Sequence, residues 1–190
     1  MAILLTDAQL ATMTDGYGMI ADGAVAIEGD RIVWRGPMAQ IPPTYAKLPR
    51  HSAEGRLVTP ALIDCHSHIV FGGDRAAEFE MRLNGASYEE VARAGGGILS
   101  TVTATRAASE DALLQQALAR ADQIIAGGAA TIEVKSGYGL TIADELKMLR
   151  VAREIGKKRS VRILTTHLAA HAIPPEYKGR SMDYIQTVAI

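Results

Sequence analysis

The sequence predicts an α/β protein in which a small all-β portion precedes a parallel sheet with helical crossovers. Residues 1–56 carry short β-type segments separated by turn residues, whereas residues 57–190 alternate strand-like apolar runs with helical patterns. Such alternation is typical of parallel sheets with right-handed crossovers. With 190 residues, 48% of them apolar, the chain holds enough material for one ordinary domain or slightly more. We therefore predict a boundary between residues 56 and 57.

The N-terminal portion, residues 1–56, is predicted to consist of short strands. Its β-type segments are AILL, AVAIE and RIVWRG, and Gly29-Asp30 between the last two is typical of a two-residue hairpin turn. Prolines at positions 37, 42, 43 and 49 then predict a loop-like connection to the second portion.

The second portion opens with the run LVTPALIDCHSHIV, residues 57–70, which predicts a strand buried on both faces. A helix is expected from Ser87 to Arg93, because Ser87 and Glu90 have the spacing of a capping box. A flexible loop is expected at residues 95–97, since this glycine run fits no phosphate-binding motif. The remaining expected elements are a helix from Ser109 to Gly127, a strand over 131–134, a helix from Ile142 to Ile155 capped by Thr141 and ended by Gly156, a strand VRILTTHL and an amphipathic stretch over 182–190.

His66 and His68, at the end of the first of these strands, are the most informative residues. Side chains two apart on a strand share a face, so both imidazoles can reach one metal ion. Neutral imidazole is a common ligand of zinc and iron. An isolated H-x-H is more often a pair of ordinary half-buried histidines, but the apolar strand before it favours a metal site. Asp64 shares their face and is either a carboxylate beside the site or a structural hydrogen-bond acceptor.

Composition excludes several classes of partner. The net charge is −1 and no basic run is present, so nothing favours binding to nucleic acid. No apolar run reaches the length of a membrane span, and the first residues lack the pattern of a targeting signal. We therefore expect a cytoplasmic protein.

Three further segments make the chain resemble imidazolonepropionase, the amidohydrolase-superfamily enzyme of histidine degradation. They are VFGGDR, which begins two residues after His68, the GGGI-x-STV-x-ATR run and KSGYGL, whereas H-x-H alone indicates only the superfamily. The resemblance covers essentially the whole chain and about the first half of a family member. It implies a TIM barrel beside a small β-sandwich that includes residues 1–56. It also implies hydrolysis of the ring amide of 4-imidazolone-5-propanoate to N-formimidoyl-L-glutamate.

The resemblance implies one metal ion, zinc or iron, held in part by this chain. His66 and His68 match the first two ligands of the family. The third histidine ligand, the late aspartate ligand and the acidic residue that handles protons have no counterpart here, and we expect them beyond Ile190. The catalytic residue is therefore unknown from this sequence.

The substrate-binding positions implied by the resemblance are Arg75, Tyr138 and His171, with Tyr88 matching a tyrosine near the substrate carboxylate. The planar guanidinium of Arg75 suits a bidentate grip on a propionate. Glycines on both sides of Tyr138 allow a backbone path that aims the phenol into a pocket. His167 is a rival of His171, and we interpret it as structural.

The length of the second portion predicts an incomplete barrel. Only about three strand-helix units fit between residues 57 and 190, whereas a closed eight-unit barrel usually needs about 250 residues. We therefore expect a fragment that is inactive by itself. Two other interpretations stay open: a related amidohydrolase or deaminase that shares the histidine pair, and a non-catalytic fragment that binds only a ligand or a partner. A homodimer is also left open.

Overall fold

The computed structural model describes residues 1–87, 89–91 and 94–190 completely, and the side chains of residues 88, 92 and 93 lie outside the described part. The protein is mixed α/β with two sheets, and it divides into two compact units, Met1–Pro60 and Ala61–Ile190. The sequence places this division at residue 56. Within the described residues, none of the helices is long and apolar enough to cross a membrane. The cytoplasmic location and the homodimer stay predictions.

The first unit is a five-stranded sheet around the central strand β1. Strand β1 pairs antiparallel with β2 and parallel with β4 and β5, and β2 pairs antiparallel with β3. The hairpin prediction is confirmed, because Glu28 of β2 pairs with Arg31 of β3 and Gly29 in the turn has φ +62°. The bounds are β1 Ala2–Ala11, β2 Met19–Glu28, β3 Arg31–Pro37, the 3-10 helix η1 Met38–Gln40, β4 Arg50–Ser52 and β5 Leu57–Val58.

The predicted single strand over residues 57–70 is wrong, because the run is split between the two units. Its first residues form β5, which pairs with Gln9 and Leu10 of β1 in the first sheet. Its later residues form β6, Leu62–Ser67, in the second sheet. Pro60 lies between the two strands and cannot donate a ladder hydrogen bond, which explains the break.

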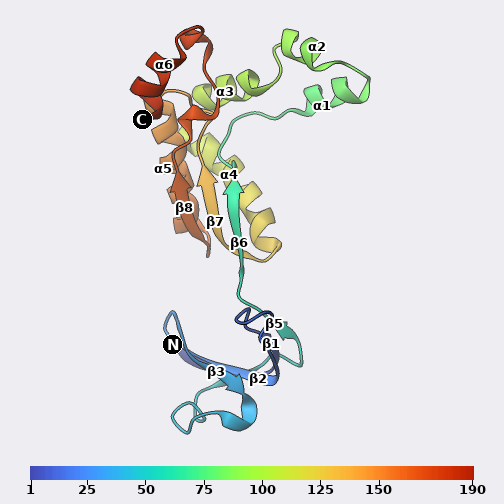
Figure 1. Cartoon of the computed structure of the whole chain (residues 1–190), viewed down its shortest axis with the longest axis vertical. Coiled ribbons are helices and arrows are strands. Elements are labelled where there is room, and N and C mark those ends of the chain that lie inside the picture. Colours follow the sequence, from blue (N-terminus) through green and yellow to red (C-terminus); the bar gives the residue numbers. More distant parts are fainter. The chain divides into compact units, whose positions relative to one another are not determined.

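The second unit contains the parallel sheet that the sequence predicts. Its strands lie in the order β6-β7-β8, with β7 at Ala129–Lys135 and β8 at Arg162–Thr166 (Figure 1). Helices α4, Glu110–Ala126, and α5, Ile142–Lys158, pack on this sheet and on each other. Ile132 and Val134 of β7 are buried in the core with these helices, whereas the alternating side chains of Glu133 and Lys135 are only partly buried.

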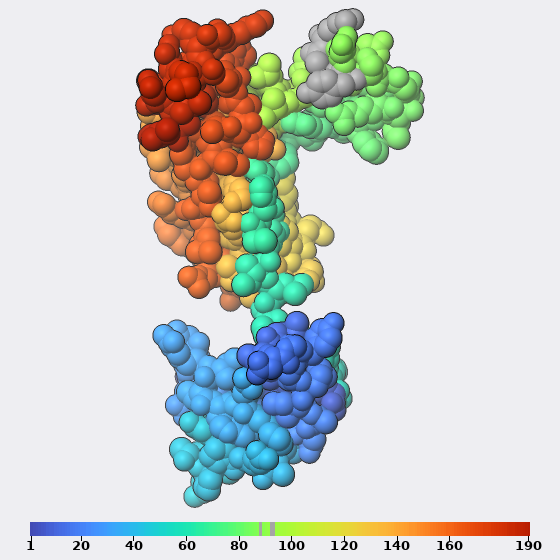
Figure 2. All heavy atoms as spheres, in the orientation of Figure 1, coloured from blue at the N-terminus to red at the C-terminus, as the bar shows by residue number. Residues whose placement is uncertain are grey.

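Strand β6 is at the edge of its sheet in the described structure, and its first residues are exposed. The exposed fractions are 61% for Leu62 and 67% for Ile63. In Figure 2 this segment runs along the visible surface of the second unit. The expected burial of this strand on both faces is therefore wrong for this chain. The reason is that helices α4 and α5 pack mainly on β7 and β8 rather than on β6, so the side chains of β6 are left uncovered.

Three predicted helix starts are confirmed by their capping hydrogen bonds. Helix α2, Tyr88–Arg93, begins with the capping box, in which the Ser87 amide donates to Glu90 Oε2 at 2.7 Å and the Glu90 amide donates to Ser87 Oγ at 3.2 Å. Ser109 Oγ accepts from the Ala112 amide at the start of α4. The Thr141 hydroxyl accepts from the Asp144 amide at the start of α5.

Other helices differ from the sequence prediction. Helix α5 continues through Gly156 to Lys158, because a side chain at position 156 would meet the Ile163 side chain of β8 at 3.3 Å and glycine allows this close packing. Two helices were not predicted, α1, Ala76–Leu83, and α3, Ile98–Ala107, which begins directly after the loop expected at residues 95–97. The C-terminal stretch is helical, as α6, Ser181–Tyr184, followed by a π-helical turn, Ile185–Ala189.

Candidate active site

The two histidines lie where β6 ends. The pairing of β6 with β7 is irregular between Asp64 and Ser67, which is typical of a β-bulge, and bulges near sites redirect side chains. The carboxylate of Asp64 accepts from the His66 amide at 3.1 Å and from the Ser67 hydroxyl at 2.6 Å. These bonds fix the backbone at the bulge. They bring the ring centroids of His66 and His68 to 5.5 Å from each other.

His68 has both ring nitrogens buried and without a hydrogen-bond partner. A buried polar atom without a partner carries a desolvation cost of about 1–3 kcal/mol. Burial lowers the pKa of the His68 imidazole, and the nearby His171, His66 and Lys135 lower it further. The ring is therefore predominantly neutral at pH 7. Neutral imidazole is the form that binds metal ions.

Tyr138 and His171 complete a ring cluster around His68. The ring centroid of His68 lies 4.8 Å from that of His171 and 5.4 Å from that of Tyr138, and the last two rings are 5.5 Å apart. Gly137, at φ +123°, makes this approach possible, because a side chain there would meet the His171 Cβ at 2.9 Å. Residues from three connections, after β6, β7 and β8, thus converge on one imidazole.

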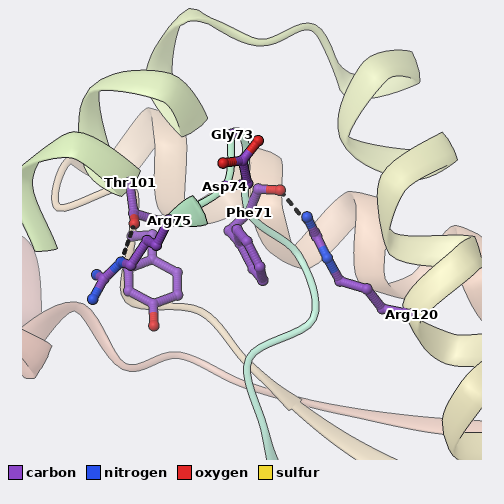
Figure 3. Close-up of a pocket in the computed structure, with 7 residues that line it drawn as sticks. Phe71, Gly73, Asp74, Arg75, Thr101 and Arg120 are labelled. Carbon is purple, nitrogen blue, oxygen red and sulfur yellow. Dashed lines mark hydrogen bonds between the residues drawn. The ribbon is translucent and has the colours of Figure 1, made fainter. Parts of the chain in front are cut away.

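A cavity of about 470 Å³ opens beside this cluster, and Arg75, Phe71, Thr101 and Tyr138 help to line it. Figure 3 shows Arg75 and Arg120 on opposite sides of Phe71. The Arg75 Nε donates to the Thr101 hydroxyl of α3 at 3.1 Å, which fixes the plane of the guanidinium. Tyr138 belongs both to the cavity wall and to the ring cluster, so the cavity and the histidines form one site.

Arg120 of α4 holds the segment that joins the histidines to Arg75. Its Nη1 donates to the carbonyl oxygens of Ile69 at 3.0 Å and Phe71 at 2.9 Å, and its guanidinium carbon lies 3.5 Å from the Phe71 ring centroid. Burial lowers the pKa of Arg120, and a guanidinium stays charged in proteins. One cation therefore binds two main-chain carbonyls and one aromatic face.

The remaining predicted residues lie elsewhere or are not described. The Tyr88 side chain lies outside the described residues. His167 is exposed, and its Nε2 lies 3.2 Å from the Val188 carbonyl oxygen, so the structure separates it from the ring cluster that contains His171.

The residues present fit a metal ion in part. The unpartnered nitrogens of the neutral His68 and the neighbouring His66 form a pair of the type that zinc and iron accept. Within the described residues, however, no group of three or more histidine, cysteine, aspartate or glutamate side chains is arranged to hold such an ion. The described residues therefore offer two imidazoles and no complete set of metal ligands.

Two charged residues near the site were missed by the sequence analysis: Arg120, and Glu145 of α5, whose Oε1 accepts from the Gly139 and Leu140 amides directly after Tyr138. Each is a charged residue at an apolar position of a helix: Arg120 lies seven residues after the buried Leu113, and Glu145 lies three before the buried Met148. A charge in the buried phase of an amphipathic helix is the signal that would have identified them.

Comparison with known proteins finds close relatives for almost the whole chain, although no family model matches it. The chain is 61% identical over 188 residues to the imidazolonepropionase of Cereibacter sphaeroides. This alignment covers 99% of this chain and 47% of the relative. Over 190 residues it is 62% identical to that of Paracoccus denitrificans, covering 98% and 48%. The chain thus spans about half the length of the curated relatives it matches, and the resemblance predicted from the sequence is confirmed.

Solved structures show a likeness of fold. An atrazine chlorohydrolase from Arthrobacter aurescens complexed with zinc matches with a TM-score of 0.56 and 18% identity, over 87% of this chain and 35% of that one. A guanine deaminase from C. acetobutylicum matches with a TM-score of 0.53 and 13% identity, over 87% and 36%. The fold of this chain is therefore similar to that of about a third of each of these two enzymes.

Proposed function

Since the chain is similar over nearly its whole length to imidazolonepropionases, we propose that it contributes half of the metal site and the substrate-anchoring wall for their reaction. Water adds across the ring amide of 4-imidazolone-5-propanoate. The amide C–N bond breaks, the carbonyl carbon becomes a carboxylate, and the nitrogen leaves as part of the formimidoyl group of N-formimidoyl-L-glutamate.

One observation carries this proposal: the half-buried imidazole of His68, whose two ring nitrogens are buried and unpartnered, contacts Tyr138 beside a cavity that Arg75 lines. A binding group for a metal ion and a binding group for an anion are thus close to each other. A substrate with a hydrolysable ring amide and a carboxylate tail needs both.

The proposed roles follow from the chemistry of each side chain. His66 and His68 hold one zinc or iron ion, which supplies Lewis acidity for activating water and polarising the amide carbonyl when it is bound. Arg75, oriented by Thr101, grips the propionate carboxylate. Tyr138 and His171 donate or accept hydrogen bonds at the imidazolone ring, and we assign Tyr88 to the carboxylate end.

We further propose that β6, β7 and β8 are the first three strands of a TIM barrel. Their sequential parallel order supports this. So do the positions of the histidine pair, at the carboxyl end of β6, and of Tyr138, after the carboxyl end of β7. In TIM-barrel enzymes the sites lie at this end of the strands. The first unit would belong to the small β-sandwich of the family.

A zinc titration followed by calorimetry tests the metal site. We expect the wild-type chain to bind zinc weakly, because two imidazoles are fewer ligands than zinc usually has. His66→Ala and His68→Ala should each abolish this binding, whereas His167→Ala, which removes a histidine outside the cluster, should not. Equal loss in the His167 variant, or full retention in the other two, contradicts the assignment.

A ligand titration of the zinc-loaded chain then tests the substrate class. We expect 4-imidazolone-5-propanoate to bind more tightly than an amidine or a purine. A preference for an amidine or a purine would instead favour a related deaminase. Ligand binding that is the same with and without zinc would favour a non-catalytic binding protein.

A further inference from the structure

The connection between β7 and α5 carries Tyr138 and is held at both ends. At its start, the Ser136 amide donates to the Thr166 carbonyl at 3.0 Å, and the buried Ser136 hydroxyl accepts from the Leu168 amide at 3.0 Å. These bonds attach it to β8 and to the segment after β8. The first part of the KSGYGL motif therefore has a structural explanation.

At its other end, the connection is held by a single carboxylate. Glu145, in the first turn of α5, is fully buried, and its Oε1 accepts from the Gly139 amide at 2.8 Å and from the Leu140 amide at 2.7 Å. Its Oε2 is also buried and has no hydrogen-bond partner. A fully buried carboxylate is costly unless its hydrogen bonds offset the loss of water, so this arrangement calls for a role.

The backbone that Glu145 binds has an unfavourable conformation. Leu140 has a backbone φ of +55°, which residues other than glycine rarely adopt, and its side chain is fully buried. Such a residue persists only where its surroundings determine its conformation. Here the Leu140 amide is bound by Glu145, and the Gly139 carbonyl accepts from Arg106 Nε at 2.7 Å. The path from Gly139 to Leu140 is thus set by side chains from α3 and α5.

Tyr138 is the residue directly before this bound pair of amides. Its ring contacts those of His68 and His171, and it lines the cavity next to Arg75. A change in the path at Gly139 would therefore move the phenol relative to the histidines. We propose that Glu145 is a positioning residue: through the Gly139 and Leu140 amides it fixes Tyr138 at the site. The consequence for substrate affinity rests on the proposed function, whereas the positioning does not.

Three variants separate this role from a general contribution to stability. Glu145→Ala removes both bonds to the amides. Glu145→Gln keeps an oxygen that can accept both of them and should rescue the wild-type behaviour. Met148→Ala is the matched control, because Met148 is equally buried on the same helix but contacts the apolar core.

Amide hydrogen exchange of the 190-residue chain, followed by NMR, measures the positioning directly. We expect the Gly139 and Leu140 amides to be protected from exchange in the wild-type chain and in Glu145→Gln. The Tyr138 ring resonances of Glu145→Gln should match those of the wild-type chain. Glu145→Ala should lose this protection and shift the Tyr138 resonances, whereas Met148→Ala should leave both amides protected relative to their neighbours. Protected amides in Glu145→Ala, or selective loss in Met148→Ala, would overturn the proposal.

A double-mutant cycle on affinity for 4-imidazolone-5-propanoate measures the consequence. When Tyr138 is displaced, its hydroxyl should lose one neutral hydrogen bond to the ligand, and such a loss changes the affinity by about two- to tenfold. Glu145→Ala should therefore weaken ligand binding by that factor in the wild-type background. In a Tyr138→Phe background the same substitution should change affinity less than about twofold. Equal effects in both backgrounds contradict a role through Tyr138. If the wild-type chain does not bind this ligand, the proposed function fails while the exchange experiment still decides the positioning.

Discussion

Replacing Arg120 with methionine should destabilise the second unit selectively. Methionine keeps the aliphatic packing of the arginine stem and a similar number of rotatable bonds, so the change mainly removes the guanidinium. The side chain then no longer binds the carbonyls of Ile69 and Phe71, at 3.0 and 2.9 Å, or the Phe71 ring face. These contacts hold the segment that follows His68.

The magnitude follows from those contacts. A hydrogen bond from a charged donor contributes about 1.5–3 kcal/mol, and a partly exposed cation-π contact adds about 0.5–1 kcal/mol. Because the guanidinium is only partly buried, water can replace some of the hydrogen bonds that the two carbonyl oxygens lose. The lower end of the energy range for each bond therefore applies. We expect the free energy of unfolding to fall by about 2–4 kcal/mol. With a urea dependence of about 1–3 kcal/mol per M, this lowers the midpoint by about 0.7–4 M.

The two units provide an internal control for this measurement. The only tryptophan, Trp34, lies in the first unit, whereas all the described α-helices lie in the second. Urea unfolding followed by far-UV circular dichroism at 222 nm therefore reports mainly on the second unit, and tryptophan fluorescence reports on the first. Arg120→Met should shift the first signal and leave the second unchanged. Replacing Arg153, an exposed arginine of α5, should shift neither. An unchanged dichroism midpoint, or equal shifts of both signals, would refute the reasoning.

Three further outcomes are expected. Arg75→Met should weaken binding of 4-imidazolone-5-propanoate by at least about tenfold through loss of a charged partner, with Arg75→Lys intermediate, and unchanged titration curves would show that the carboxylate is held elsewhere. Burial raises the pKa of the Tyr184 hydroxyl, which donates to the Ala169 carbonyl, to about 12. The pKa of tyrosine in the unfolded chain is about 10. Below that pH, Tyr184 therefore makes its full contribution to the stability of the fold, and this contribution is lost as the pH rises towards 12. Urea midpoints across this range should fall less in Tyr184→Phe. Finally, the 190-residue chain should self-associate on size-exclusion chromatography through its exposed β6 edge and should not hydrolyse the substrate. A monomer with activity would contradict this.

The elements that the sequence predicted correctly have short-range causes. The hairpin at Gly29-Asp30, the capping box of Ser87 and Glu90, and the N-caps Ser109 and Thr141 all depend on contacts within a few residues. Such contacts form in the same way whatever the rest of the chain does. For this reason the pattern of residues was sufficient to locate them.

Helix α3 shows why other elements could not be predicted. Its sequence, ILSTVTATRA, is rich in β-branched residues, which have low helix propensity. Two of its threonines accept hydrogen bonds from a segment distant in the sequence: the Gly72 amide donates to the Thr105 hydroxyl, and Arg75 Nε donates to the Thr101 hydroxyl. These tertiary contacts override local propensity.

The sequence by itself determined which residue types the site contains, because His66, His68 and the KSGYGL segment can be recognised one segment at a time. Only the tertiary structure decided that His68, Tyr138 and His171 share one cluster. Only the tertiary structure revealed that Arg120 holds the segment after His68. The physical reason is range: the bulge of β6 depends on its pairing with β7, and the contacts of Arg120 join residues about fifty positions apart. No local pattern encodes a pairing between two such distant segments, so the geometry of the site exists only once the sheet and its helices have formed.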